Sequence, residues 1–190
     1  MSDKPPECLQ TRRAFTGNLI SLDVDTVRYA DGHEKSVEIV RHGGASAILA
    51  FLDDPGSSDP RILVLRQYRY AVKDYLLEIP AGGLEENESP LACAARELKE
   101  ETGWTAGTIE PLASIYTTPG FTDEVIHIFI ASGLKAGEAE LEKDELLEVE
   151  TVRFSEAVAR ISSGGIADSK TALALLFASR FVRGSQPAGP

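Results

Sequence analysis

The sequence is short of cysteine and of basic residues. Only two of its 190 residues are cysteine, Cys8 and Cys93, which is too few for a disulfide framework and typical of free thiols in a reducing compartment. Lysine and arginine number 19 against 30 acidic residues, which gives a formal net charge of −11. Nucleic acids and anionic membranes are bound by clustered cationic side chains, so we expect neither as a partner.

Long apolar runs are also missing. No stretch approaches the roughly 20 apolar residues that span a bilayer. The opening residues, MSDKPPECLQTRR, lack the apolar segment of a signal peptide. We therefore expect a cytoplasmic protein. With 43% hydrophobic and 26% charged residues, the composition is that of an ordinary globular domain with a sizeable core.

The stretch from residue 82 to residue 104, GGLEENESPLACAARELKEETGW, contains a helix with recognisable ends. Ser89 can accept a hydrogen bond from an unpaired N–H of the first turn, and Pro90 has no N–H to leave unpaired. Gly103 is the residue type that most often follows the last turn of a helix. The sequence therefore predicts a helix that begins at Pro90 and ends before Gly103.

Three glutamates fall on one face of this predicted helix. At about 100° per residue, Glu97, Glu100 and Glu101 lie within an arc of roughly 100°, with Arg96 just beyond its edge. Carboxylates at this spacing repel one another. A hard divalent cation would remove the repulsion, because Mg²⁺ prefers carboxylate and carbonyl oxygens as ligands. The alternative is a solvated acidic helix.

The rest of the chain mixes strand-like and helix-like patterns. A turn signal at residues 30–32 separates two alternating segments and predicts an amino-terminal β-hairpin with too little core of its own. Two helices are expected near the end, over residues 155–162 and 168–182. The expected strands cover residues 19–27, 36–40, 45–52, 61–65, 76–79, 112–117, 125–131 and 149–154. Short connections between mixed elements favour an α/β fold with helices on both faces of a mixed sheet.

A spaced motif runs through the acidic helix. It consists of Gly82, five residues, Glu88, seven residues, and then the run RELKEETGW from Arg96 to Trp104. In this the chain resembles the Nudix hydrolase family, although Trp104 stands where the family usually has an aliphatic residue. The resemblance implies a Nudix-type α/β/α sandwich and hydrolysis of a diphosphate with Mg²⁺, or Mn²⁺, as the cofactor. An inactive domain of the same fold is the alternative.

The resemblance also implies roles for the residues of the motif. The expected metal ligands lie in the helix or just before it: Glu97, Glu100, Glu101 and the backbone carbonyl of Ala81. Arg96 would pair with one of these carboxylates and hold it in place. Glu88 would lie nearby as a supporting residue, or would be an ordinary carboxylate close to the positive end of the helix.

Two further segments resemble the ADP-ribose pyrophosphatase branch of the family. They are EIPAG, residues 78–82, and TPGFTDE, residues 118–124, in which Pro119 lies 16 residues beyond Gly103. The resemblance implies cleavage of ADP-ribose to AMP and ribose 5-phosphate. It also implies a homodimer in which the amino-terminal hairpin crosses to the partner. For Pro119, an ordinary Pro-Gly turn is the alternative.

The branch resemblance extends to residues that would contact the substrate. Arg41 would reach the adenosine pocket of the other subunit, Arg69 would contact the diphosphate or ribose, and Glu124 would lie near the terminal ribose. Either arginine could instead be an ordinary surface residue. The catalytic base would come from the acidic loop 137–148, with Glu145 as the first choice, and Asp144 or Glu100 as alternatives. A merely solvated acidic loop is the other reading.

These patterns divide the chain into four parts. We expect a disordered start over residues 1–11, a dimerisation β segment over residues 12–43, the Nudix hydrolase domain over residues 44–184 and a loose tail over residues 185–190.

Two other functions stay open from the sequence. The first is hydrolysis of a different nucleoside diphosphate sugar, such as ADP-glucose or GDP-mannose. The second is a non-catalytic sensor that binds ADP-ribose, which the complete motif and the lack of a basic DNA-binding segment disfavour.

Overall fold

The computed structural model describes residues 4–140 and 146–182. The chain forms two compact units, one of Met1–Gly44 with Tyr116–Val125 and the other of Ala45–Ile115 with Ile126–Pro190. None of the helices in the described part of the chain has the length and apolar character that a membrane span requires.

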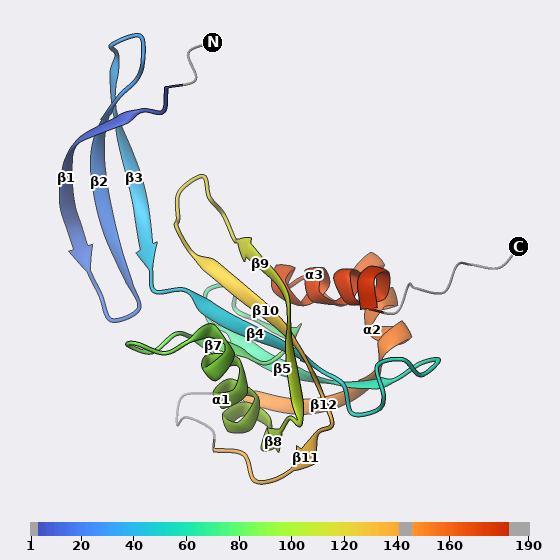
Figure 1. Cartoon of the computed structure of the whole chain (residues 1–190). Coiled ribbons are helices and arrows are strands. Elements are labelled where there is room, and N and C mark those ends of the chain that lie inside the picture. Colours follow the sequence, from blue (N-terminus) through green and yellow to red (C-terminus); the bar gives the residue numbers. More distant parts are fainter. Residues whose placement is uncertain (1–3, 141–145, 183–190) are drawn as a thin grey trace, which may run out of the picture. The chain divides into compact units, whose positions relative to one another are not determined.

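The first unit contains a three-stranded antiparallel sheet in the order β1-β2-β3 (Figure 1). Its strands are β1 (Glu7–Thr16), β2 (Ile20–Arg28) and β3 (Glu34–His42). The expected hairpin is present as β2 and β3, and Gly32 in the turn between them has a φ of 90°, which only glycine adopts readily.

The sequence did not indicate the first half of β1. We expected a disordered start over residues 1–11, but β1 begins at Glu7 and pairs with β2 along its length. All ten of its residues are exposed, so no alternation of apolar and polar residues marks the strand. Pairing with β2, a contact distant in sequence, provides the hydrogen bonds instead. The boundaries between the expected parts of the chain otherwise stay predictions.

The second unit is built on two larger sheets and a short two-stranded ladder. The first sheet has the order β7-β4-β10-β9, and β4 and β10 are parallel within it. The second has the order β12-β5-β6 and is antiparallel, and β8 pairs with β11 in the ladder. The strands are β4 (Ala45–Ala50), β5 (Arg61–Arg69), β6 (Asp74–Glu78), β7 (Ala81–Gly83), β8 (Trp104–Thr105), β9 (Thr108–Tyr116), β10 (Val125–Ser132), β11 (Lys135–Ala136) and β12 (Leu147–Arg153).

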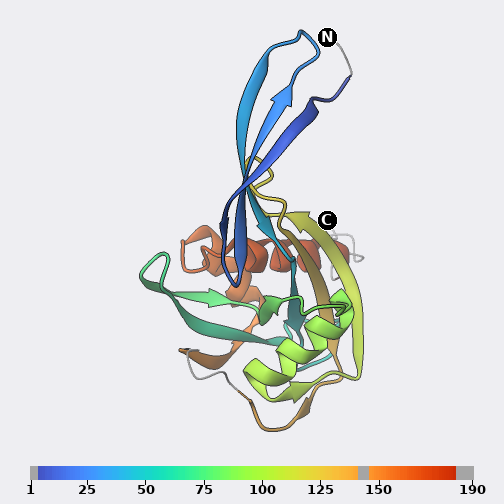
Figure 2. The ribbon, with the colours of Figure 1, turned by 90° about the vertical axis from the view of Figure 1, so that its left-hand side faces the viewer.

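Among the described residues of this unit, three α-helices cover the sheets: α1 (Pro90–Thr102), α2 (Phe154–Ser162) and α3 (Ser169–Phe177). Helix α1 lies on one side of β4, and α2 and α3 lie on the other (Figures 1 and 2). The mixed α/β fold is therefore confirmed. The last helix is shorter than expected, because α3 ends at Phe177 and a π-helical turn, Ala178–Val182, follows it.

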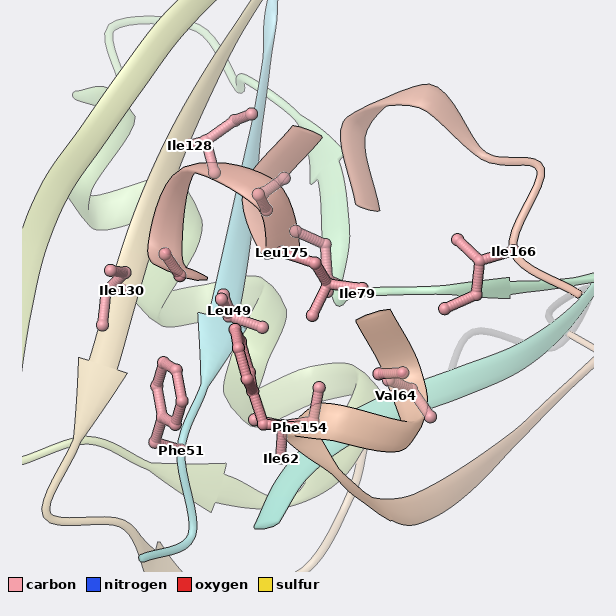
Figure 3. Close-up of a cluster of buried hydrophobic side chains, with 14 of the residues drawn as sticks. Leu49, Phe51, Ile62, Val64, Ile79, Ile128, Ile130, Phe154, Ile166 and Leu175 are labelled. Carbon is pink, nitrogen blue, oxygen red and sulfur yellow. The ribbon is translucent and has the colours of Figure 1, made fainter. Parts of the chain in front are cut away.

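Alternate residues of β4, and Phe51, which directly follows it, contribute to two hydrophobic clusters. Leu49 and Phe51 point to the side of α2 and α3, where Phe154 and Leu175 pack with them (Figure 3). Ile48 and Ala50 belong to the other cluster, together with apolar residues of α1 such as Leu98. This period-two division is what a strand buried on both faces requires, and it explains the continuous apolar run of β4 in the sequence. Because α1 packs against the cluster of Ile48 and Ala50 through its apolar residues, its glutamates lie on a different face of the helix.

Candidate active site

Helix α1 has the ends that the sequence predicts. The Ser89 hydroxyl accepts a hydrogen bond from the N–H of Ala92 at 3.2 Å, and Pro90 is the first helical residue. Gly103 ends the helix with a φ of 75°, and its N–H donates to the carbonyl of Lys99 at 2.8 Å. A side chain on Gly103 would also lie 2.7 Å from the backbone nitrogen of Ala139. Glycine is therefore required here both by conformation and by close packing.

A cavity of about 230 Å³ opens beside this helix in the second unit. The residues that line it include Gln67, Arg69, Gly82, Glu97, Glu100 and Glu101. The three glutamates thus share one cavity, as their spacing predicts.

The burial of the three glutamates differs. Glu97 and Glu101 are only 8% and 2% exposed, whereas more than a third of the Glu100 side chain is exposed. Glu101 accepts a hydrogen bond from the backbone N–H of Ala81 at 2.9 Å, so the residue just before Gly82 is tied to the helix. Buried carboxylates need such partners, because an unpaired buried charge strongly destabilises a fold.

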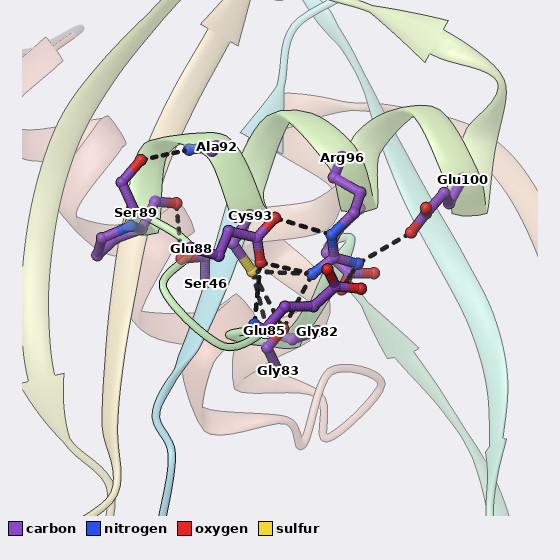
Figure 4. A network of polar contacts seen from close by, with 12 residues as sticks. Ser46, Gly82, Gly83, Glu85, Glu88, Ser89, Ala92, Cys93, Arg96 and Glu100 are labelled. Carbon is purple, nitrogen blue, oxygen red and sulfur yellow. Dashed lines mark hydrogen bonds and ion pairs between the residues drawn. The ribbon is translucent and has the colours of Figure 1, made fainter.

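Arg96 connects the carboxylates of the helix (Figure 4). Its Nη1 donates to Glu97 at 2.6 Å and to Glu100 at 2.9 Å. Its Nε and Nη2 each donate to Glu88 at 2.9 Å, and Nη2 also donates to the carbonyl of Gly83 at 3.0 Å. These hydrogen bonds lower the pKa of Glu88 to about 2 and raise the pKa of Arg96. Arg96 therefore holds Glu97 and Glu100 in place at the cavity and also ties the helix to Gly83 of β7.

Gly82 makes room for one of these carboxylates. A Cβ atom on Gly82 would lie 1.9 Å from Oε1 of Glu97 and 2.2 Å from its Cδ, far inside contact distance. The backbone of Gly82 is not in the left-handed region, so its conformation does not demand glycine. The glycine of the motif is explained here by the space that the Glu97 carboxylate occupies.

The oxygen-rich lining suits a divalent cation in its chemistry. Carboxylates from Glu97, Glu100 and Glu101 are hard ligands of the kind that Mg²⁺ and Mn²⁺ accept. Within the described ranges, however, no three acidic, histidine or cysteine side chains are grouped as ligands of one ion, and Arg96 is paired with two of the three glutamates. The donor set fits a metal in its chemistry, and Glu97 and Glu100 would have to turn from Arg96 toward the ion. The ligand roles of the glutamates and of the Ala81 carbonyl stay predictions.

Arg69 is held at the cavity by a buried carboxylate that the sequence did not single out. Its Nε and Nη2 donate to the two oxygens of Glu78, each at 2.8 Å, and Glu78 is 1% exposed. Lys170, from α3, also donates to Glu78. Burial alone would raise the pKa of Glu78, but the hydrogen bonds from Arg69 and Lys170 outweigh it and hold the pKa below its ordinary value. Lys170 lies 92 residues from Glu78, so no local pattern could have indicated this pair.

The other expected substrate residues belong to the first unit. Arg41 donates to Asp23 at 3.1 Å and to Asp123 at 3.0 Å, and Glu124 accepts a hydrogen bond from the Thr117 hydroxyl at 2.7 Å. Pro119 lies in a turn closed by the hydrogen bond from Phe121 to Thr118, the ordinary turn that the sequence allowed. Contacts of Arg41, Pro119 and Glu124 with a substrate stay predictions. Glu145 and Asp144, considered for the catalytic base, lie outside the described residues.

Comparison with known proteins decides the family. A profile of the NUDIX domain matches residues 42–172. The chain belongs to the Nudix hydrolase family. This confirms the interpretation of the motif between Gly82 and Trp104, and members of the family generally use a divalent metal.

Several relatives of this Nudix chain cover almost its whole length. An ADP-ribose pyrophosphatase of Bacillus subtilis is 37% identical over 93% of this chain and 94% of its own. A methanol dehydrogenase activator of Bacillus methanolicus is 39% identical over 89% and 90%, and a GDP-mannose pyrophosphatase of Cronobacter sakazakii is 33% identical over 86% and 84%. A crystal structure of an ADP compounds hydrolase superposes with a TM-score of 0.83, 19% identity and 97% coverage of both chains, which supports the fold.

Proposed function

We propose that this Nudix hydrolase cleaves the diphosphate of ADP-ribose, in the presence of Mg²⁺ or Mn²⁺, and releases AMP and ribose 5-phosphate. The observation that supports this most strongly is the single cavity shared by Arg69 and the three helix glutamates. A cationic fork beside clustered carboxylates suits a substrate whose phosphate oxygens are bound partly by the protein and partly through metal ions. The relatives named as ADP-ribose pyrophosphatases favour this substrate.

The reaction consumes one water molecule. An oxygen of water bonds to one phosphorus, the bond from that phosphorus to the bridging oxygen breaks, and the bridging oxygen leaves with the other phosphate. Glu97, Glu100, Glu101 and the Ala81 carbonyl would hold the metal, which supplies positive charge next to the phosphate oxygens. Arg69 would bind the nonbridging oxygens, because its guanidinium already lines the cavity. Arg96 would orient Glu97 and Glu100, with which it pairs.

The proton of the attacking water needs a base. We assign this role to Glu145, with Asp144 and Glu100 as alternatives. Glu100 lines the described cavity and keeps more than a third of its side chain exposed. Glu145→Gln and Asp144→Asn test the assignment, since loss of the true base lowers the chemical step by roughly 10²- to 10⁴-fold. If neither variant loses activity, the role passes to Glu100, whose replacement would also remove a proposed metal ligand.

We further propose that the chain acts as a homodimer through its first unit. Large apolar side chains are exposed on and next to β1 and β2: Leu9, Phe15, Leu19 and Ile20. A second copy would cover them, and Arg41 would then contact the adenosine of the partner's substrate. Light scattering on the purified chain tests this. A dimer that Phe15→Glu converts to a monomer supports the proposal, and a monomeric wild-type chain contradicts it.

The substrate is tested by a panel of nucleoside diphosphate sugars with the products identified by mass spectrometry. The proposal predicts that ADP-ribose gives the highest kcat/KM, with AMP and ribose 5-phosphate as products. GDP-mannose is the second candidate, because GDP-mannose pyrophosphatases are among the relatives. A higher kcat/KM for GDP-mannose than for ADP-ribose would replace the proposed substrate. Tight binding of ADP-ribose without any turnover would instead favour a sensor.

A further inference from the structure

Behind Arg69 lies a buried group of charges that no step of the reaction uses directly. Glu78 and Lys170 are 1% and 7% exposed; Lys170 donates a hydrogen bond to Glu78 and forms an ion pair with Asp168 at 3.1 Å. Together with Arg69, the group has two positive and two negative side chains. Buried charges are strongly destabilising unless they are paired, so a group of this kind is retained only with every member in contact.

The same group fixes the position of α3 against the strand that leads into the cavity. Asp168 caps α3 by accepting from the N–H of Thr171 at 2.9 Å. The hydroxyl of Thr171 accepts from the N–H of Ile79 at 2.8 Å, next to Glu78 at the end of β6. Lys170 therefore lies in a helix turn that is held by the Asp168 cap and by the hydrogen bond between Thr171 and Ile79.

The geometry leaves one edge of Arg69 for the cavity. Glu78 occupies Nε and Nη2 of the guanidinium, while Nη1 has no hydrogen-bond partner among the described residues. About 40% of the Arg69 side chain is exposed, and it lines the same cavity as the helix glutamates. A guanidinium held by two parallel hydrogen bonds loses little further freedom when its remaining donors bind an anion.

We propose that Lys170 is a positioning residue that holds Arg69 correctly placed for a diphosphate and shares the negative charge of Glu78, so that the charge of Arg69 is only partly neutralised. The proposal rests on the proposed function. Glu78 has one carboxylate for two cations, so Lys170 takes up part of the negative charge that would otherwise neutralise Arg69. Without Lys170, the negative charges of Glu78 and Asp168 are balanced by Arg69 alone, so Arg69 presents less net positive charge to the cavity. The substrate then binds more weakly, although Lys170 never touches it.

The first test is Lys170→Met in the full-length chain, assayed with ADP-ribose and saturating Mg²⁺. The expected result is a KM about tenfold higher with kcat within about threefold of wild type, because an interaction present in both the bound substrate and the transition state is weakened. A purely structural role would lower the melting temperature and the active fraction, and so kcat, while KM stayed unchanged. The control is Lys135→Met, which makes the same change on the exposed strand β11.

A double-mutant cycle shows whether Lys170 acts through Arg69. Arg69→Met should raise KM more than Lys170→Met does, and adding Lys170→Met to it should raise KM no further. Additive effects of the two substitutions would overturn the proposal. So would an unchanged KM in Lys170→Met.

A second variant covers the possibility that Lys170→Met does not fold. Asp168→Asn keeps an oxygen for the helix cap and removes one negative charge, so its KM should be about twofold to threefold lower than that of wild type. An unchanged or raised KM in Asp168→Asn would overturn the charge argument. Wild-type turnover is measured first: a chain that hydrolyses none of the nucleoside diphosphate sugars refutes the proposed function and this inference together, whereas normal wild-type turnover with an unmoved KM in the variants refutes only this inference.

Discussion

Replacing Gly82 by alanine is expected to lower kcat about 10²-fold and leave the fold intact. The added Cβ would lie 1.9 Å from one carboxylate oxygen of Glu97 and 2.2 Å from its Cδ. Backbone conformation does not oppose alanine at this position. The flexible end of Glu97 must therefore move by about 1 Å or more, and a displacement of that size in a catalytic group lowers the rate by about 10²-fold.

The matched control lies one residue further along the chain. A Cβ on Gly83 meets nothing within 4 Å, so Gly83→Ala should keep kcat and KM within about twofold of wild type. Both variants are assayed with ADP-ribose and Mg²⁺, and circular dichroism melts report on folding. Gly82→Ala should have a kcat about 10²-fold lower and a melting temperature within a few degrees of wild type. A folded Gly82→Ala with wild-type kcat would refute the role given to the position of Glu97.

Three further predictions concern individual side chains of the second unit and the two cysteines. Glu101→Gln should lower kcat by several orders of magnitude while the protein stays folded, because glutamine can still accept the Ala81 hydrogen bond; near-normal turnover would contradict the role of this carboxylate. The pKa of Glu88 is lowered to about 2, so its pairing with Arg96 stabilises the fold above about pH 4.5, and this stabilisation is lost as the pH falls toward 2. The melting temperature of Glu88→Gln should therefore depend less on pH in this range than that of wild type. An unchanged pH dependence would argue against the pairing. Burial raises the pKa of Cys93 to about 11 whereas Cys8 is exposed, so a thiol reagent at pH 8 should label one cysteine in the native chain and two in denaturant; rapid labelling of both in the native chain would contradict the burial.

The parts of the site that the sequence could predict are those determined by local chemistry. The ends of α1 follow from Ser89, Pro90 and Gly103, each of which acts within one helical turn. The clustering of the glutamates follows from the helical period alone. Both were visible because the residues responsible are close together along the chain.

The parts that escaped prediction depend on contacts between distant residues. Strand β1 is exposed at every position, and only its pairing with β2 makes it a strand. Lys170 and Glu78 meet across 92 residues, and the hydrogen bond from Ile79 to Thr171 spans the same distance. Sequence periodicity describes one element at a time, so it could not show that α3 supports the cavity beside α1.

The sequence offered both Arg41 and Arg69 as candidate substrate residues, with Arg69 slightly favoured because a guanidinium suits phosphate oxygens, and the structure separates their environments. Arg69 is bound by the buried Glu78 and lines the cavity with the glutamates. Arg41 is bound by Asp23, Asp25 and Asp123 within the first unit. A diphosphate role for Arg69 can therefore be tested in a single chain, whereas the proposed role of Arg41 depends on a dimer.

Hydrolysis of ADP-ribose by the chelator-treated chain, measured as Mg²⁺ is added back, tests the central claim most directly. We expect no turnover in the presence of chelator, and recovery with Mg²⁺ to give AMP and ribose 5-phosphate in equal amounts. Turnover that persists in chelator, or a Mg²⁺-loaded chain that leaves every diphosphate of the panel intact, would contradict the account of an acidic cavity that cleaves diphosphates through bound cations.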